Sequence, residues 1–288
     1  MPSMTYRRLA DVVSWAGKKP HFVDIEPKTL AISPGAIKSA INSETALILA
    51  VHPIVNCCNV DEILDIAKTY SIPVIFDAVE SVHETYKGNR IGSFGVGEVF
   101  SLHASKLING IEGGYVCSND EQFVSSLRQI KNLNSHESNT TKIQSDINPI
   151  HSAFALAGLD ELEKNVSHNK SVYRNYQKEL GSIDSVRILE FDENETTAYK
   201  NIVIEVLDSS AINRDRLVDL LNSRHNIQAR KHYSPPLHQK KMLYDSYTEN
   251  VSNSDIAEKR YLNLPCGQKF SPEDTKIVTA LIEKYTKG

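Results

Sequence analysis

A carboxylate at the end of an apolar strand is the first candidate for chemistry. Residues 73–76 form a short apolar run, Asp77 follows them directly, and Glu80 comes three positions later. Ligands bind at the carboxyl ends of the strands in open α/β sheets, so Asp77 is a candidate site residue. The alternative is that Asp77 only caps a following helix, because Asp is a preferred N-cap residue.

A second segment places two hydroxyls, an imidazole and an amine within six positions. A strand expected over residues 98–102 delivers Ser101 and leads to His103, Ser105 and Lys106. A single lysine is usually a solvated surface charge. This one is flanked by small and apolar residues, and glycines that allow close backbone approach follow it. A lysine held in such a pocket can form a Schiff base with a carbonyl compound.

Alternating helices and strands are expected over the first 130 residues, which indicates an α/β fold with a largely parallel sheet. Apolar residues at helical spacing predict helices over 6–16, 34–41, 60–70 and 120–132. Apolar runs predict strands over 21–25, 45–51, 73–76, 98–102 and 115–117. The polar stretch 133–147 is expected to be a long loop, which is usually functional or in contact with a partner.

The pattern changes near residue 181, where we expect a domain boundary. Before it, two helices over 150–163 and 165–180 are expected to run nearly end to end. After it, strands are expected over 186–189, 201–206 and 227–230, with a helix over 213–224. A last helix begins at the capping box of Ser271 and ends at Tyr285. The sequence therefore predicts a large α/β domain over 1–180 and a small α+β domain over 181–288.

Composition excludes several classes of protein. The 288 residues are 40% hydrophobic and carry a net charge of −4, so no basic surplus favours nucleic acid. The apolar runs fall short of the roughly 20 residues that a membrane span needs. The four cysteines have no disulfide-framework spacing, which suits a reducing compartment, and the histidines form no metal-binding motif. We therefore expect a cytoplasmic enzyme or binding protein without a metal.

Taken together, the candidate residues resemble a known family. Asp77, Glu80, Ser101 and Lys106 are separated by 3, 21 and 5 positions. This order resembles the sugar-nucleotide aminotransferases of the DegT/DnrJ/StrS group, which are fold-type I enzymes dependent on pyridoxal 5'-phosphate (PLP). Segments similar to the family extend over essentially the whole chain, at residues 20–25, 86–95, 112–114, 230–238 and 264–265.

The resemblance implies a role for each matching residue in the cofactor site. Lys106 would form the Schiff base with PLP, and Asp77 would pair with the pyridine nitrogen. Ser101 would bind the phosphate, and Tyr6 would stack on the ring. Tyr6 could instead be a partly buried tyrosine at a helix start. Asn148 would reach the phosphate of a neighbouring subunit, which implies a homodimer with shared active sites.

The resemblance also implies the reaction and the remaining site residues. Glu80 would belong to the cofactor site, and Arg230, Tyr233 and His238 would contact the substrate. The reaction would move an amino group from glutamate or glutamine to a nucleotide-linked keto-sugar, as in polysaccharide biosynthesis. A PLP-dependent sugar dehydratase is the alternative within this chemistry, but those relatives carry histidine in place of Lys106.

Two departures from the family pattern leave a further alternative open. Glu80 stands where most members carry Gln or His. Met1 matches the start of the family's P-S-x-T segment, so the upstream Gly-Thr turn that cradles the cofactor phosphate has no counterpart in this sequence. We therefore expect an N-terminally truncated member with weakened PLP binding. A non-catalytic or decayed homologue, retained as a partner or fragment, is the alternative.

Overall fold

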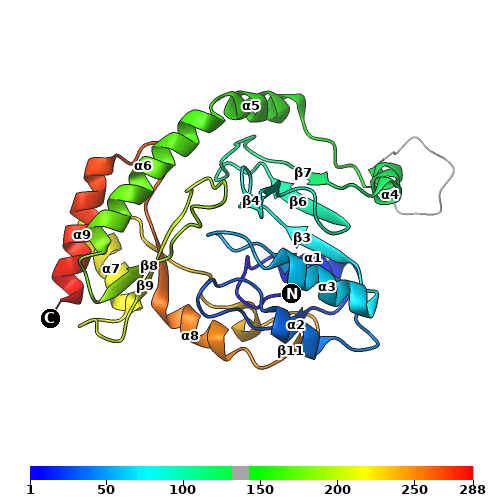
Figure 1. Ribbon diagram of the computed structural model, residues 1–288, viewed down its shortest axis with the longest axis horizontal. Coiled ribbons are helices and arrows are strands. Elements are labelled where there is room, and N and C mark those ends of the chain that lie inside the picture. The colour runs from blue at the N-terminus through cyan, green and yellow to red at the C-terminus, as the bar shows by residue number, and fades with distance from the viewer. Residues whose placement is uncertain (132–142, 288) are drawn as a thin grey trace.

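The computed structural model describes residues 1–131 and 143–287. Its N-terminal half is built on a four-stranded sheet of order β2-β3-β6-β7 (Figure 1). These strands are β2 Ile48–Val51, β3 Val74–Asp77, β6 Gly97–Ser101 and β7 Gly114–Cys117. The first three are parallel, and β7 at the edge is antiparallel to β6. Because β3 and β6 are parallel neighbours, their last residues, Asp77 and Ser101, lie at the same edge of the sheet.

Helices cover the apolar side chains of this sheet. In α3 Val60–Tyr70, Asn59 caps the first turn and the left-handed Ser71 ends the helix. Its buried Ile63, Ile66 and Ala67 recur at helical spacing and pack in one core with side chains of β2 and β3. α2 Pro34–Ala40 packs against α3. The short α1 Leu9–Trp15 precedes the sheet, and α4 Glu121–Lys131 follows β7.

A second four-stranded sheet, of order β10-β12-β9-β8, belongs to the C-terminal half and is antiparallel throughout. Its strands are β8 Val186–Ile188, β9 Ile202–Val206, β10 Arg230–Lys231 and β12 Tyr261–Leu264. The helices of this half are α7 Arg214–His225, α8 Ser252–Arg260 and α9 Pro272–Thr286. The short helix η1 Leu237–Gln239 lies between β10 and α8.

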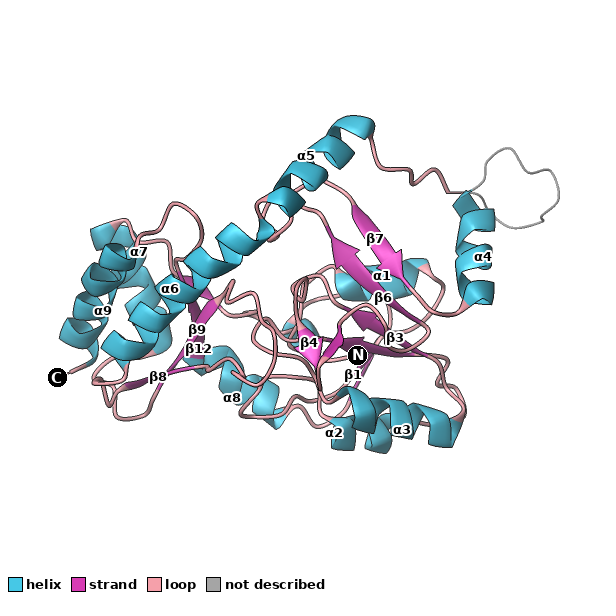
Figure 2. Cartoon of the chain, turned by 45° about the horizontal axis from the view of Figure 1, so that its top comes forward, coloured by secondary structure: helices cyan, strands magenta, loops and turns pink. Residues whose placement is uncertain are grey.

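Two helices join the halves. α5 Pro149–Asp160 and α6 Leu162–Leu180 run nearly end to end as one long arm (Figure 2). α6 packs on α9 and on β8, and its Val172, Tyr173 and Tyr176 enter the C-terminal core. The halves also meet where β1 His21–Phe22 pairs in parallel with β11 Tyr247–Thr248. The predicted division at residue 181 remains a prediction.

Most predicted elements are present with their ends shifted by a few residues, and three differences stand out. The strand expected over 227–230 is wrong, because only Arg230 and Lys231 pair in the sheet. The side chain of Asn222 accepts from the N–H of Ala229 and donates to its carbonyl, so this backbone is satisfied without a strand partner. α8 and β12 were not predicted.

Three further observations concern the loop, a hairpin and the possibility of a membrane span. The loop predicted over 133–147 falls largely outside the described residues, and 143–147 have no regular secondary structure. The short hairpin of β4 Thr85–Tyr86 and β5 Asn89–Arg90 was also not predicted. Among the described residues, no helix combines the length and the apolar character that crossing a membrane requires.

Candidate active site

A cavity of about 1490 Å³ includes the carboxyl edge of the N-terminal sheet, extends along β2 and α1, and takes lining residues from both halves of the chain. Most of the site residues predicted from the sequence line it. They are Tyr6, Asp77, Glu80, Ser101, Lys106, Arg230 and Tyr233. Residues more than 200 positions apart in the sequence therefore contribute to one cavity.

Asp77 is the last residue of β3 and is buried. Its Oδ1 accepts the N–H of Val79 at 3.1 Å. Residues 78–84, all of which the structure describes, contain no helix, so Asp77 is not the cap of a following helix. Burial raises the pKa of Asp77, and the Val79 N–H and the positive charge of Lys106 only partly offset this effect. Because Asp77 lines the cavity, its carboxylate can interact with a cationic group there.

Lys106 lies in the loop after β6, and its Nζ donates a hydrogen bond to Oε1 of Glu80. Both side chains are mostly buried, with exposed fractions of 12% and 17%. Glu80 follows β3 and Lys106 follows β6, so the parallel pairing of these strands brings the two residues together. The structure confirms that the amine is enclosed rather than solvated.

A second lysine, which was not predicted, contacts the same carboxylate. Nζ of Lys200 lies 2.5 Å from Oε2 of Glu80. Burial would raise the pKa of Glu80, but Lys200 and Lys106 outweigh burial and lower it, so Glu80 is ionised. Lys200 stands 120 positions from Glu80, two residues before β9, and no local motif marks it. Only the packing of the two halves reveals this contact.

The serines after the sheet differ in their surroundings. Oγ of Ser101, at the end of β6, accepts the N–H of His103 at 3.2 Å. Ser105 is exposed, and its Oγ lies 2.9 Å from Nδ1 of His103. Both hydroxyls remain at the carboxyl edge, where a phosphate could accept hydrogen bonds from them.

Three predicted residues line the cavity further from Lys106 in the sequence. Tyr6 precedes α1 and is 53% exposed, and its role in the site remains a prediction. Arg230 lies on β10 and is exposed. Tyr233 is half-buried, and burial together with the charges of Glu80 and Asp77 raises its pKa. Tyr233 therefore keeps its proton and can donate a hydrogen bond into the cavity.

Two predicted site residues, Asn148 and His238, are not among the described residues that line the cavity. Asn148 caps α5, with its Oδ1 accepting the N–H of Ile150 at 2.8 Å. His238 lies in η1, with Nδ1 2.6 Å from Oγ of Ser3 and Nε2 3.0 Å from Oδ1 of Asp255. The site roles of Asn148 and His238 remain predictions.

A buried imidazole supports Asp77. The backbone N–H of His52 donates to the carbonyl of Asp77 at 3.0 Å. Nε2 of His52 lies 3.3 Å from Oε1 of Glu98, and Nδ1 lies 3.4 Å from Sγ of Cys58. Burial disfavours the imidazolium, but Cys58, Cys57 and Glu98 outweigh it and raise the pKa of His52. A protonated His52 favours the ionised form of Asp77.

The donor set of the cavity fits PLP. The enclosed amine of Lys106 can bind the aldehyde, and the carboxylate of Asp77 can pair with a protonated ring nitrogen. Ser101 offers a hydroxyl to the phosphate at the same sheet edge. The cavity of about 1490 Å³ leaves room for a cofactor and a substrate. Fold and site together fit a PLP-dependent transferase of fold type I.

The chain belongs to the DegT/DnrJ/EryC1/StrS aminotransferase family, whose sequence pattern matches residues 1–283. This is a family of PLP-dependent sugar aminotransferases, and PLP is its cofactor. The chain is 25% identical over 305 residues to the spore coat polysaccharide biosynthesis protein SpsC of Bacillus subtilis (strain 168). That alignment covers 99% of this chain and 78% of SpsC.

Solved structures share the fold. A structure of DesI, determined in the presence of its TDP-sugar product, superimposes with a TM-score of 0.93 at 24% identity. The match covers 99% of this chain and 73% of DesI. A DegT DnrJ EryC1 StrS aminotransferase from Brucella abortus gives a TM-score of 0.89 at 23% identity. This match covers 100% of this chain and 79% of the Brucella chain.

Proposed function

We propose that the chain transfers an amino group from glutamate or glutamine to a keto-sugar linked to a nucleotide. The observation that carries this proposal is the enclosed amine of Lys106 beside Glu80, in the same cavity as Asp77. The three residues come from the ends of two adjacent parallel strands, which hold them at one sheet edge. Their chemistry is that of a lysine and a carboxylate acting on PLP.

Each residue has a task that its surroundings support. PLP, when bound, supplies the electron sink that stabilises a carbanion at the donor's Cα. Lys106 would bind the aldehyde of the cofactor, and its amine would move the donor's α-proton as general acid and base. Asp77 keeps a proton on the ring nitrogen, and the Val79 N–H orients its carboxylate. Ser101 binds the phosphate, and Arg230 and Tyr233 contact the sugar substrate.

Other parts of the proposal concern assembly, organisation and location. We propose a homodimer with shared active sites, in which Asn148 reaches the partner, and the exposed apolar side chains of α5 support a contact there. We also propose a large domain over 1–180, a small domain over 181–288 and a cytoplasmic location. All four cysteines are free thiols, which supports a reducing compartment.

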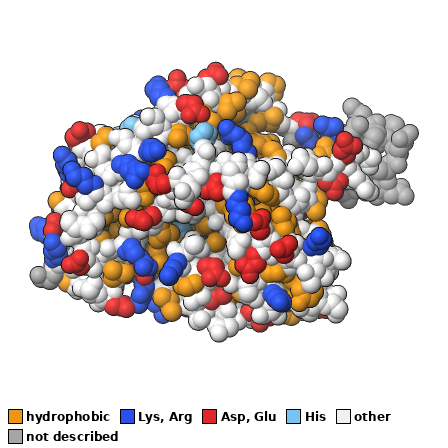
Figure 3. Space-filling model, viewed as in Figure 1, with side chains coloured by type: hydrophobic (Ala, Val, Ile, Leu, Met, Phe, Trp, Pro, Cys, Tyr) orange, Lys and Arg blue, Asp and Glu red, His pale blue; other side chains and the backbone are white. Residues whose placement is uncertain are grey.

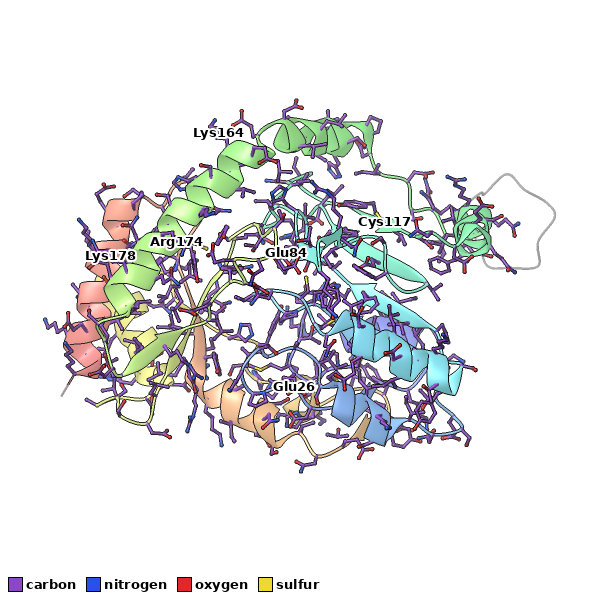
Figure 4. All side chains as sticks on the ribbon, in the orientation of Figure 1. Glu26, Glu84, Cys117, Lys164, Arg174 and Lys178 are labelled. Atoms are coloured by element: carbon purple, nitrogen blue, oxygen red, sulfur yellow. The ribbon has the colours of Figure 1, made fainter. Side chains whose placement is uncertain are left out.

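The proposal is tested by fixing the cofactor onto the protein. We expect added PLP followed by borohydride to label Lys106, and peptide mapping to find the modified residue. Lys106→Ala should lose the label and the turnover, whereas Lys164→Ala should keep both. Lys164 is a matched control because it is an exposed lysine on α6 that pairs with Glu161 (Figure 4).

The alternatives predict different results. A non-catalytic homologue would show no conversion of PLP to its amino form when glutamate is added. A dehydratase would form that amino form but would remove a hydroxyl from the sugar instead of aminating it. Label on another lysine, with Lys106 unmodified, would contradict the assignment of Lys106.

A further inference from the structure

Glu80 is contacted by two lysines that use opposite oxygens of its carboxylate. Oε1 accepts from Nζ of Lys106, and Oε2 lies 2.5 Å from Nζ of Lys200. The exposed fractions of the three side chains are between 12% and 18%. One buried carboxylate therefore serves two ammonium groups, while the function proposed above uses only one of them.

The backbone around Lys200 holds this lysine in place. Tyr199, the residue before it, is buried and has a left-handed φ of 48°. Sγ of Cys266 donates to the carbonyl of Lys200 at 2.9 Å. The side chain of Asn201 donates to the carbonyl of Ile54 at 3.4 Å, which ties the segment just before β9 to the N-terminal half. The second ammonium is thus carried by a segment whose backbone is held by contacts to both halves, rather than by a free surface chain.

The second lysine on Glu80 is important because the proposed reaction requires Lys106 to leave this carboxylate. To attack an aldehyde, Lys106 must give up a proton and its hydrogen bond to Glu80. If Lys106 were the sole partner, this step would leave a buried carboxylate without a counter-charge, which is strongly unfavourable. Lys200 stays on the other oxygen, so Glu80 remains paired when Lys106 departs.

We propose that Lys200 is a positioning residue that keeps Glu80 paired and thereby lets the amine of Lys106 leave this carboxylate. The inference rests on the proposed role of Lys106 as the reactive amine. Lys200 acts in two ways, since it satisfies Glu80 and its own positive charge disfavours a second ammonium nearby. Removing the charge of Lys200 should therefore make Lys106 retain its proton to higher pH.

Other charged and titratable groups face the same cavity and stay constant in the test. They come from the end of β3, the loop after β6, β10 and its following loop, and the loop after β12. These groups are Asp77, His103, Arg230, Tyr233 and Cys266. The same cavity is also lined, elsewhere along the chain, by Tyr6, Arg7, Arg8, Lys18, Lys19, His21, Glu44, Lys231, Lys240 and Tyr247. Because none of them is altered, a change in the behaviour of Lys106 reports on Glu80 and Lys200.

The test measures how fast Lys106 is acetylated by acetic anhydride as a function of pH, with peptide mass spectrometry as the readout. Only the unprotonated amine reacts, so the midpoint of the profile shows where Lys106 loses its proton. We expect Lys200→Met to raise this midpoint by about one pH unit, which is about a tenfold loss of reactivity below it. Lys200→Arg keeps the charge and should restore the midpoint.

A third variant checks the direction of the effect. Glu80→Gln leaves two ammonium groups without their shared carboxylate, so the midpoint of Lys106 should fall instead of rise. Lys164→Met, on the surface of α6, should leave the midpoint unchanged. If Lys200 is only a structural tether, Lys200→Met lowers the melting temperature but leaves the Lys106 midpoint unchanged, and the proposal is wrong.

The measurement also separates this inference from the proposed function. Acetylation needs no PLP, so a shifted midpoint supports the pairing of Lys200 with Glu80 whether or not PLP labels Lys106. If PLP does label Lys106, we expect its fixation by borohydride at neutral pH to be about tenfold slower in Lys200→Met. If Lys200→Met fixes PLP at the wild-type rate and the acetylation midpoint of Lys106 is unchanged, the proposed role of Lys200 is wrong.

Discussion

Asp77 shows how a single residue can combine a local and a chemical role. Its carboxylate accepts the Val79 N–H and faces the cavity of Lys106. Asn keeps the acceptor oxygen but lacks the charge, so Asp77→Asn should change unfolding free energy by no more than about 1 kcal/mol. The loss of charge should slow half-transamination with glutamate by about a hundredfold or more.

The comparison of the two measurements decides the role of Asp77. Urea unfolding measures the stability, and the change in PLP absorbance on adding glutamate measures the chemistry. If Asp77→Asn reacts with glutamate at the wild-type rate, Asp77 serves only the turn that its bond to Val79 closes.

Glu84 predicts a pH dependence of stability. It is buried near the middle of the molecule, beside β4 (Figure 4). Burial raises the pKa of Glu84 from 4.5 to about 8. The folded state therefore binds a proton more tightly than the unfolded state, and this contribution to stability is lost as the pH rises from 4.5 to about 8. Glutamine is neutral throughout, so Glu84→Gln should escape this loss.

The expected stabilisation by Glu84→Gln is small at pH 5 and on the order of 1–3 kcal/mol at pH 8.5. Urea unfolding at the two pH values measures it. The exposed Glu44 is a matched control, since Glu44→Gln should change stability little at either pH. An equal effect of Glu84→Gln at both pH values would contradict the prediction.

Residues that lie in local patterns could be predicted from the sequence, and residues fixed by packing could not. Asp77 and Lys106 each follow an apolar strand, and parallel strands bring such ends together. Lys200 reaches the site through the packing of distant segments and has no neighbouring motif. His52 follows the apolar run 45–51 as Asp77 follows 73–76, but only the structure shows its contacts with Asp77, Cys58 and Glu98.

At the scale of elements, the pairing of β6 with β7 depends on a glycine. Gly114 lies opposite Ser101, and a Cβ on Gly114 would come within 2.5 Å of the carbonyl oxygen of Phe100. Gly114→Ala should therefore push β7 from β6 and destabilise the fold by about 1–3 kcal/mol. It should also weaken PLP binding, because Ser101 would move with β6.

The same substitution in a helix is the control for Gly114→Ala. A Cβ on Gly35, in α2, would meet only Oγ of Ser33 at 3.7 Å, which is an ordinary contact. Gly35→Ala should be neutral or stabilise the protein by up to about 1 kcal/mol. Thermal unfolding compares the two variants, and similar melting temperatures would refute the role assigned to Gly114.

Elements were predictable where periodicity and caps agreed. The helix predicted over 60–70 from its apolar face matches α3, and in the structure the Asn59 cap and the left-handed Ser71 fix the same ends. The strand over 227–230 was wrong because the side chain of Asn222 bonds the backbone there. β12 pairs with strands distant in sequence, and its register depends on those partners.

At the scale of the molecule, α5 has an apolar surface without a partner in the single chain. All twelve of its residues are described and none is buried. Its exposed apolar side chains are Ile150, Phe154, Leu156 and Leu159. Hydrophobic side chains gather over this helix at the top of the molecule (Figure 3). Such a patch is typical of a protein contact, and Asn148 begins the same helix.

The proposed homodimer therefore predicts that a charge on α5 separates the subunits. Leu156 is 64% exposed, so Leu156→Asp should leave the fold within about 0.5 kcal/mol of wild type but place a charge in the contact. Leu243 is 98% exposed and lies outside α5, so Leu243→Asp is the matched control. Light scattering during gel filtration should give the mass of a dimer for wild type and Leu243→Asp, and that of a monomer for Leu156→Asp. A dimer that persists in Leu156→Asp would exclude α5 as the contact, and a monomeric wild type would exclude the homodimer.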